Sequence, residues 1–396
     1  MKKQKLIIAL LFLASVVNAE YWTQKADFGG TKRADATGVS IGNKGYIGTG
    51  YDGMYTSDWW EYDPSTNIWS QKANFGGAAS VEAVSFSIGN FGYVLGSPSD
   101  TTFWQYNPSL NVWTQMASFP GGARQAAVSF AINGKGYVCS GIFSTSFDDL
   151  WEYDPVTNAW LQKANLPPGG RHYSCGFAIG DNGYITTGIG SSFSLLNDLW
   201  EWNQPSDTWT QKANFPGTPR IEASAFALNG YGYVGMGSGN GVYNFDFYRY
   251  DPVTNTWVQR ANFLGGTREE ASQFSIGNFG YAGTGWDGVT AGVSKKDFWQ
   301  YNPLDSATAI SEHQVADFDF TVFPNPFTEY ATVKLKTPVI EKLEIKIFNA
   351  QGKEVYSRNV NAQEVKIYNE NFARGAYSIS VLKSGHQIGN KKVIIN

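Results

Sequence analysis

The sequence is poor in histidine and cysteine, with 3 His and 2 Cys among 396 residues. Only His172 lies between residues 20 and 303, so this region lacks the ligands for a copper centre of clustered His and Tyr. Cys139 and Cys175 fit an oxidising compartment without requiring one, and whether they pair depends on a Cα separation that the sequence does not give. We therefore expect no metal and no cofactor.

Long apolar runs are also absent after the N-terminus. Lysines at the start of the chain precede an apolar run over residues 6–17, and small residues flank a cleavage position before Glu20. This pattern predicts a secretory signal peptide, residues 1–19, and its apolar run is too short to span a membrane. We expect an exported protein with no membrane span.

Positive charge is scarce over residues 20–316, which hold 16 Lys+Arg against 26 Asp+Glu. Such an acidic segment repels polyanions, and no glycine-rich phosphate loop opens a helix, so no nucleic acid is expected as a partner. Residues 317–396 differ, with 11 Lys+Arg against 8 Asp+Glu. The change in composition predicts two domains with different surfaces.

What the chain has in abundance is an aromatic-rich repeat. A segment close to Trp-x-Gln-Lys-Ala-Asn-Phe occurs six times at intervals of 44 to 49 residues, beginning at Trp22, Trp69, Trp113, Trp160, Trp209 and Trp257. Units of this length made of short strands bury their apolar faces by stacking on one another, which is typical of a β-propeller. The tryptophans are then expected to pack between blades.

Each repeat predicts a four-stranded meander, with tight Gly-Asn and Asp-Pro turns between its strands. In the first unit the strands are expected over residues 34–41, 45–50, 58–63 and 68–72. The sixth unit stops after its third strand, at Pro303, and Tyr21–Lys25 has the sequence of the missing fourth. We predict six blades over residues 20–303, the last closed by the N-terminal strand.

The repeat resembles the kelch family. An arginine precedes the first strand, Gly-Tyr lies in the second, and Tyr and Trp are separated by six residues, as in Tyr62 and Trp69. The Gly-Gly doublet of that family is loosened here, for example to Gly48-Thr49-Gly50. The resemblance covers nearly all of residues 21–303 and implies a six-bladed propeller. Kelch propellers include protein-binding modules, copper oxidases and sialic acid mutarotases, so the fold chooses no function.

Residues 317–396 alternate apolar and polar side chains, which is typical of a small immunoglobulin-like β-sandwich. Strands are expected over residues 331–335, 343–348, 365–368, 377–382 and 392–395. Residues 304–316 are interpreted as a linker. The fold class is therefore all-β, a six-bladed propeller followed by a sandwich.

Three motifs occur in order in this tail: Phe323-Pro324-Asn325-Pro326, Gly375-Ala376-Tyr377, and Lys391-Lys392-Val393-Ile394-Ile395. In this order they resemble the type A C-terminal sorting domain of the Bacteroidetes type IX secretion system. The resemblance implies the type IX machinery as a partner, passage across the outer membrane, removal of the tail, and surface attachment or release. A carbohydrate-binding or adhesive immunoglobulin-like module is the alternative.

Recognition is expected on one face of the propeller, which we call the loop face. It carries the connections from fourth strand to first and from second strand to third, and these vary in length between blades. The longer second-to-third connections are residues 51–55, 142–147, 189–197, 238–245 and 286–295. Aromatic side chains outside the repeat frame are candidates for stacking on a sugar or partner: Tyr51, Tyr55, Phe143, Phe193, Tyr243 and Trp286.

A polar ring is expected where the first strands enter from the loop face. Five blades have an arginine there, and the residues two positions later are Asp35, Glu82, Ala126, Tyr173, Glu222 and Glu270. Alternation along a strand predicts that both positions share a side. The candidate ligand-binding residues are Asp35, Glu82, Tyr173, Glu222, Glu270, Arg124, Arg171, Arg220, Tyr51 and Trp286. The alternative, favoured for the arginines because they recur, is pairing with an acid or a loop carbonyl.

Three further features have structural interpretations. An aspartate precedes the third strand in five blades, but one carboxylate per blade is not the oxygen cage that Ca²⁺ prefers, so a local hydrogen bond to the loop backbone is favoured. His172 is interpreted as a structural donor. We hypothesise a monomeric secreted protein that binds a protein or glycan. The alternative is a propeller enzyme acting on free sugars, resembling a sialic acid mutarotase, with no catalytic residue assigned.

Overall fold

The computed structural model describes residues 21–96, 99, 101–288, 293–303, 320–335, 343–349, 354–369, 372–383 and 386–395. These residues form two compact units, divided between residues 306 and 307. The predicted signal peptide, residues 1–19, and linker, residues 304–316, lie outside the described residues. The described part of the chain contains strands, turns and loops, and none of it is a helix that could cross a membrane.

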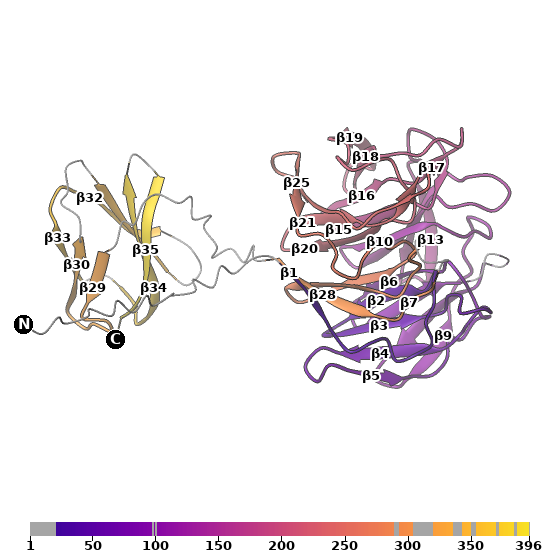
Figure 1. Ribbon diagram of the computed structural model, residues 1–396, viewed down its shortest axis with the longest axis horizontal. Coiled ribbons are helices and arrows are strands. Elements are labelled where there is room, and N and C mark those ends of the chain that lie inside the picture. The colour runs from indigo at the N-terminus through magenta and orange to yellow at the C-terminus, as the bar shows by residue number, and fades with distance from the viewer. Residues whose placement is uncertain are drawn as a thin grey trace, which may run out of the picture. The chain divides into compact units, whose positions relative to one another are not determined.

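The first unit consists of six four-stranded antiparallel sheets, the blades of a β-propeller (Figure 1). Blade one is β2 (Thr37–Ile41), β3 (Lys44–Gly48), β4 (Trp59–Asp63) and β5 (Ile68–Gln71); blade two is β6 (Val84–Ile88), β7 (Phe91–Leu95), β8 (Phe103–Asn107) and β9 (Val112–Gln115); blade three is β10 (Val128–Ile132), β11 (Lys135–Cys139), β12 (Leu150–Asp154) and β13 (Ala159–Lys163).

Blade four is β15 (Cys175–Ile179), β16 (Asn182–Thr186), β18 (Leu199–Asn203) and β19 (Thr208–Lys212); blade five is β20 (Ser224–Leu228), β21 (Tyr231–Gly235), β24 (Phe247–Asp251) and β25 (Thr256–Arg260); blade six is β26 (Ser272–Ile276), β27 (Phe279–Gly283), β28 (Phe298–Asn302) and β1 (Tyr21–Gln24). Two short pairs lie in the connections, β14 (Arg171–His172) with β17 (Ile189–Gly190) and β22 (Ser238–Gly239) with β23 (Val242–Tyr243).

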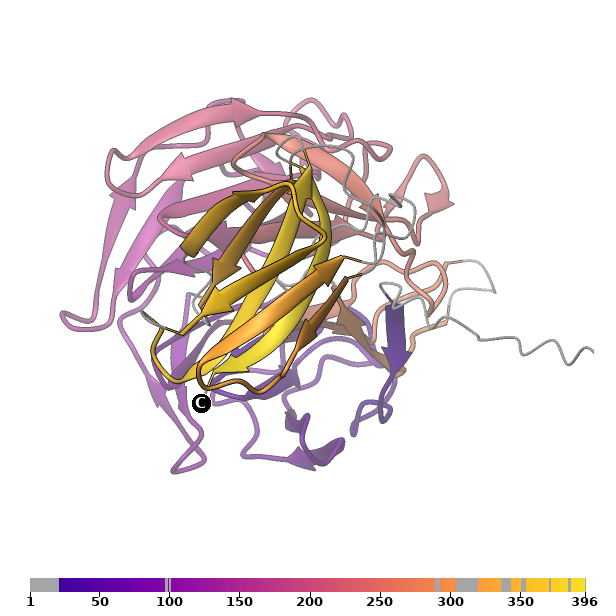
Figure 2. The same cartoon turned by 90° about the vertical axis from the view of Figure 1, so that its left-hand side faces the viewer.

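The blades close into a ring, as the repeat predicts. The first strands contact one another in the order β2, β6, β10, β15, β20 and β26, and β26 contacts β2 again. Figure 2 shows the blades following one another around this ring in chain order. The N-terminal strand β1 pairs antiparallel with β28, with Tyr21 opposite Asn302 and Gln24 opposite Trp299. Closure by the N-terminal strand is therefore confirmed.

The repeat tryptophans are structural. In blade one the Trp69 ring packs 5.0 Å from the Tyr62 ring, and its indole N–H donates to the Ala26 carbonyl at 3.1 Å. The same bond recurs in blade four, from Trp209 to the Ala164 carbonyl at 2.8 Å. Each bond joins a fourth strand to the connection that enters its blade, so these indoles are not free to stack on a sugar.

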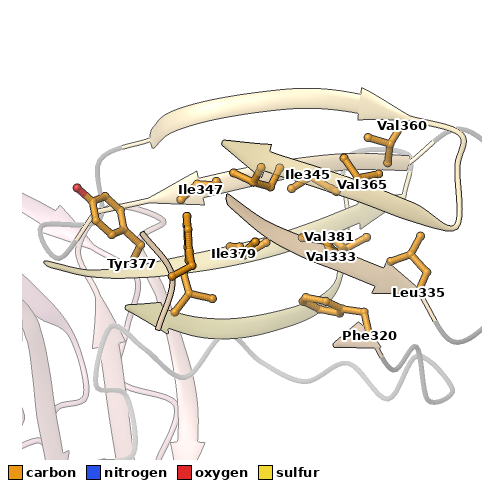
Figure 3. Packing of buried hydrophobic residues seen from close by; sticks show 14 of the residues in the cluster. Phe320, Val333, Leu335, Ile345, Ile347, Val360, Val365, Tyr377, Ile379 and Val381 are labelled. Atoms are coloured by element: carbon orange, nitrogen blue, oxygen red, sulfur yellow. The ribbon is translucent and has the colours of Figure 1, made fainter. Parts of the chain in front are cut away.

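The second unit is a β-sandwich. One sheet has the order β29 (Phe320–Phe323), β30 (Tyr330–Leu335), β33 (Glu364–Tyr368), and the other has the order β32 (Glu354–Val360), β31 (Leu343–Phe348), β34 (Gly375–Lys383), β35 (His386–Ile395). Figure 3 shows Val333, Ile345, Ile379 and Val381 filling its core. The sequence analysis missed β29 and β32, because β29 precedes the Pro-rich turn and β32 carries mostly exposed side chains.

The three tail motifs meet beside the C-terminal strand. The Asn325 side-chain oxygen accepts the Ile394 N–H at 2.8 Å, and the Phe327 N–H donates to the Ile394 carbonyl at 3.1 Å. Gly375 and Tyr377 lie opposite Ile395 and Val393 in the β34–β35 pair, and Lys391 lies opposite Ile379. Motifs separated by some 70 residues thus form one continuous structure.

Candidate functional site

The entry to each blade has a backbone conformation that strand alternation does not predict. All six residues two positions after the arginine, or after its replacement Ser80, have positive φ: Asp35 55°, Glu82 53°, Ala126 53°, Tyr173 55°, Glu222 54° and Glu270 57°. Positive φ is uncommon outside glycine, so its occurrence at the equivalent position of all six blades is a regular feature of the repeat. This turn delays the first strand, so that β2 begins at Thr37 rather than at residue 34. It also sends the arginine and the later residue in different directions.

The arginines are consequently buried and do not present free side chains on the loop face. Arg124, Arg171 and Arg220 are 5%, 1% and 0% exposed. Arg171 donates from both terminal nitrogens to the Asp198 carboxylate, each at 2.8 Å, and this bidentate pairing recurs in five blades: Arg33–Asp58, Arg124–Asp149, Arg171–Asp198, Arg220–Asp246 and Arg268–Asp297. The assignment of Arg124, Arg171 and Arg220 to ligand binding is thereby corrected, and the alternative of pairing with an acid is confirmed.

The recurring aspartates have the partners that this pairing implies. Asp198 also accepts the Trp200 indole N–H at 2.7 Å. Burial raises the pKa of Asp198, but the hydrogen bonds and charge of Arg171 outweigh burial and hold that pKa below its usual value. These carboxylates are paired with arginines within the scaffold rather than directed at a metal. The main partners of Asp198 are the Arg171 guanidinium and the Trp200 indole, whereas the predicted partner was the loop backbone.

The structure brings the other ring candidates together. Asp35, Glu82, Tyr173, Glu222 and Glu270 line one cavity of about 140 Å³ at the centre of the loop face, together with Gln273. Backbone hydrogen bonds fix the ring from blade to blade, for example from Glu82 N–H to the Asp35 carbonyl at 3.1 Å and from Glu222 N–H to the Tyr173 carbonyl at 2.9 Å. The positive-φ turn therefore presents one side chain per blade to a shared space.

A fourth glutamate, Glu269, lies beside the cavity-lining Glu222 and Glu270, and it was not among the predicted site residues. Glu269 is 8% exposed, and carboxylate oxygens of Glu222, Glu269 and Glu270 lie within 4.8 Å of one another. The sequence does mark this position, because blade six is the one blade in which two consecutive acids follow the arginine. Three carboxyl groups are fewer than the oxygen ligands that Ca²⁺ takes, and hydrogen bonds among them satisfy part of their oxygens.

Asp35 and Glu222 have raised pKa values and hold protons at neutral pH. Burial raises the pKa of Glu222, and the negative charges of Glu270 and Glu269 raise it further. Burial and the charges of Glu270 and Glu82 likewise raise the pKa of Asp35. For Glu82, burial raises the pKa to about 7, against a smaller opposing effect of the Tyr173 hydroxyl, which donates to it at 3.4 Å. The cavity thus combines protonated and ionisable carboxyl groups.

Two of the predicted loop aromatics, Tyr51 and Trp286, pair through their backbones with residues next to the ring of acidic side chains. Tyr51 pairs through its backbone with Ala34, and Trp286 pairs in the same way with Glu269. The Tyr51 side chain is 43% exposed and lies 6.2 Å from the Tyr55 ring, whereas Trp286 is half-buried. Other aromatics are still more open, with Phe143 64% and Phe193 83% exposed. Tyr51 and Trp286 are therefore joined through the backbone to Ala34 and Glu269, which are sequence neighbours of ring residues Asp35 and Glu270.

His172 and the cysteines have structural surroundings. The buried His172 ring hydrogen-bonds through Nδ1 to the Ser146 hydroxyl at 2.9 Å, and burial lowers its pKa. Cys139 and Cys175 are buried free thiols, so the pairing that the sequence left open does not occur. Burial raises the pKa of Cys175 to about 12, which leaves this thiol unreactive at neutral pH.

Raising the pH is expected to weaken the wild type relative to Glu82→Gln. Because the pKa of Glu82 rises from 4.5 to about 7 on folding, the folded state binds more protons between these values, and the free energy of unfolding falls as pH rises through that window. Glutamine does not ionise, so the two proteins should melt alike at pH 4 and the variant a few degrees higher at pH 8. Asp27→Asn, at an exposed position, is the control; a difference constant across pH would contradict the proton on Glu82.

Comparisons with known proteins agree with this architecture. Residues 321–396 match the family model described as a secretion system C-terminal sorting domain. The chain therefore carries a type IX sorting domain and is exported to the cell surface or the extracellular space.

Two individual proteins are similar over part of the chain. Ulvan lyase NLR42 of Nonlabens ulvanivorans is 29% identical over 109 residues, or 27% of this chain and 20% of that protein, so the match spans a fifth of its length. Among solved structures, that of YjhT is 18% identical with a TM-score of 0.63, over 71% of this chain and 98% of that chain. At this identity the likeness shows the fold alone.

Proposed function

We propose that this protein is a secreted or cell-surface binding protein that recognises a glycan or a protein through the loop face of its propeller. Residues 20–303 form the recognition domain in this proposal, and residues 317–396 deliver it. The observation that carries the proposal is the convergence of Asp35, Glu82, Tyr173, Glu222 and Glu270 on one cavity between variable loops. The five arginine pairs hold the scaffold that positions them.

The shape of the face suits a ligand that lies across it. A cavity of about 140 Å³ is smaller than the roughly 300–1,000 Å³ of sites that enclose a small molecule, so one group of the ligand enters while the rest contacts the rim. Carboxylates accept hydrogen bonds from hydroxyl groups, and exposed rings such as Tyr51 and Phe193 offer stacking surfaces. Sugars present both hydroxyl groups and apolar ring faces.

One observation favours an enzyme acting on free sugars as the second candidate. Glu222 carries a proton while hydrogen-bonded to other glutamates, and a protonated carboxyl beside an ionisable one is the arrangement that general acid–base catalysis uses. The burial of the arginines removes them as the positive partners of such a step. Proton transfer to and from a sugar would then rest on Glu222, Glu269 and Glu270.

Glycan-array binding by the secreted chain, set beside an NMR assay of sugar anomer interconversion, separates the two. A binder is expected to show array signals that weaken at least tenfold in Glu222→Gln, with anomer exchange no faster than in buffer. If Glu222→Gln loses catalysis but keeps its affinity for the sugar, the hypothesis of a binding protein without catalytic activity is rejected. Glu61→Gln, in the third strand of blade one and away from the cavity, is the matched control.

A further inference from the structure

A second and larger hollow lies on the loop face where blade six meets blade one. Its volume is about 550 Å³, within the usual range for ligand sites. Three connections build it: the entry to blade one with Thr31 and Lys32, the second-to-third connection of blade six with Lys295 and Lys296, and the entry to blade six with Arg268. We call this hollow the lysine pocket.

The charges in the lysine pocket do not cancel. Arg268 is neutralised by Asp297, and Lys295 pairs with the buried Asp287 at 2.6 Å. Lys32 and Lys296 are exposed, and within the described residues neither has an ion-pair partner. Two uncompensated positive charges therefore face a hollow on a domain that holds more acids than bases.

The other blades act as internal controls for this feature. At the five other entries, the residue before the arginine or its replacement is Ala79, Ala123, Gly170, Pro219 or Thr267. In the four other blades that keep the aspartate, the two residues before it are Thr56-Ser57, Phe147-Asp148, Leu196-Asn197 and Asn244-Phe245. None of these is basic. The fold does not require lysine at these positions, and all three lysines occur at one junction.

The lysine pocket and the acid-lined cavity are neighbours. Glu269 pairs through its backbone with Trp286, and Trp286 pairs with Ser294, which lines the lysine pocket. Two strand spacings therefore separate the acidic centre from the edge of the pocket, roughly 10 Å. A single extended ligand can reach both places.

We propose that the lysine pocket binds the carboxylate or sulfate groups of an acidic polysaccharide whose hydroxyl groups occupy the acid-lined cavity. This inference rests on the proposed function and names the ligand class. A polysaccharide fits because three kinds of group follow one another from the centre to the pocket. Carboxyl groups at the centre accept hydrogen bonds from sugar hydroxyl groups, Trp286 lies between, and Lys32 and Lys296 supply positive charge in the pocket. Nucleic acid carries a charge on every phosphate, so the net negative charge of residues 20–316 disfavours it more strongly than a polysaccharide with fewer charges.

The test measures binding of the full-length mature protein to four immobilised polymers: a polyuronate, a sulfated polysaccharide of neutral sugars, an uncharged polysaccharide and polyglutamate. The wild type is expected to prefer one or both acidic polysaccharides, and the first two arms tell carboxylate from sulfate. Lys32→Gln with Lys296→Gln should weaken that binding at least tenfold. The control is the double variant Lys44→Gln with Lys135→Gln, which removes two positive charges from the opposite face. Its binding to the acidic polysaccharides should differ less than twofold from that of the wild type.

Added salt should weaken wild-type binding and have less effect on the lysine double variant, because salt screens exposed charges. Both lysines are exposed, so melting temperatures should not change. Equal binding of uncharged polymer, unchanged affinity in the double variant, or tight binding of polyglutamate would each overturn the assignment. Glycan binding that ignores the lysines but falls in Glu222→Gln would reject this pocket and leave the proposed function standing, whereas loss of every array signal in the wild type would reject both.

Discussion

Deleting residues 317–396 is expected to abolish appearance of the protein outside the cell while leaving the propeller folded in the periplasm. The matched sorting domain covers residues 321–396, and its core is built only from residues between Phe320 and Ile395. Among the described residues, the core clusters of the propeller contain none of those residues. Fractionation of cells and medium, followed by a melting curve of the periplasmic product, measures both halves of this expectation.

A surface change in the same domain provides the control for that deletion. Lys334 is exposed and pairs with the equally exposed Glu364, so Lys334→Gln should cost little stability and leave export unchanged. Asn325→Ala should reduce export less than the deletion does and more than Lys334→Gln does. It removes the side-chain oxygen that accepts the Ile394 N–H and joins the Pro-rich turn to the C-terminal strand. Normal export of the truncated chain would refute delivery by the tail. An unfolded periplasmic product would instead show that the propeller depends on it.

The ring could be predicted because its repeat is long and its aromatic positions are fixed. Six tryptophans at near-constant spacing, with one strand missing at the end and present at the start, leave closure as the arrangement that satisfies every edge. The sandwich was less clear. Its edge strand β32 carries Glu354, Ser357 and Arg358 among its residues, and such a segment has no simple alternation to recognise.

The recurrence of the arginines predicted their pairing with an acid, but alternation predicted the wrong side for them, because alternation holds only where the chain is already a strand. Positive φ at Asp35 and its equivalents turns the backbone before β2 begins, and no composition rule signals this at an acid, an alanine and a tyrosine alike. One signal was available. Blade two lacks both members of the ion pair, with Ser80 and Thr102 at their positions, and a joint replacement indicates contact.

The candidate site divides along the same line. The acid ring is periodic, one residue per blade, so a sequence repeat that predicts the blades also predicts which side chains converge. The lysine pocket is aperiodic: Lys32 and Lys295 lie at opposite ends of the propeller sequence and meet only because β1 closes the ring. A site that forms only when the first and last units meet cannot be predicted from the sequence of a single repeat.

Trp22→Ala is expected to lower the stability of the propeller by about 3–5 kcal/mol, or roughly 10 °C in Tm. Trp22 is 3% exposed, and its ring lies 5.2, 4.9 and 5.0 Å from the rings of Phe247, Phe263 and Tyr301. Truncation leaves a cavity between blades five and six at the point where the ring closes. Thermal unfolding of the mature protein, followed by near-ultraviolet circular dichroism, measures the loss.

Tyr21→Ala is the matched control, because Tyr21 lies on the same strand but is 47% exposed, and we expect a change within about 1 kcal/mol. Deleting Glu20–Lys25 should exceed both substitutions, since it also frees the backbone of β28 that pairs with Tyr21 through Gln24. Because Lys32 follows that strand, the deletion should disturb the lysine pocket as well. Equal, small effects of Trp22→Ala and Tyr21→Ala would contradict closure by β1, and with it the juxtaposition of Lys32 with Lys296.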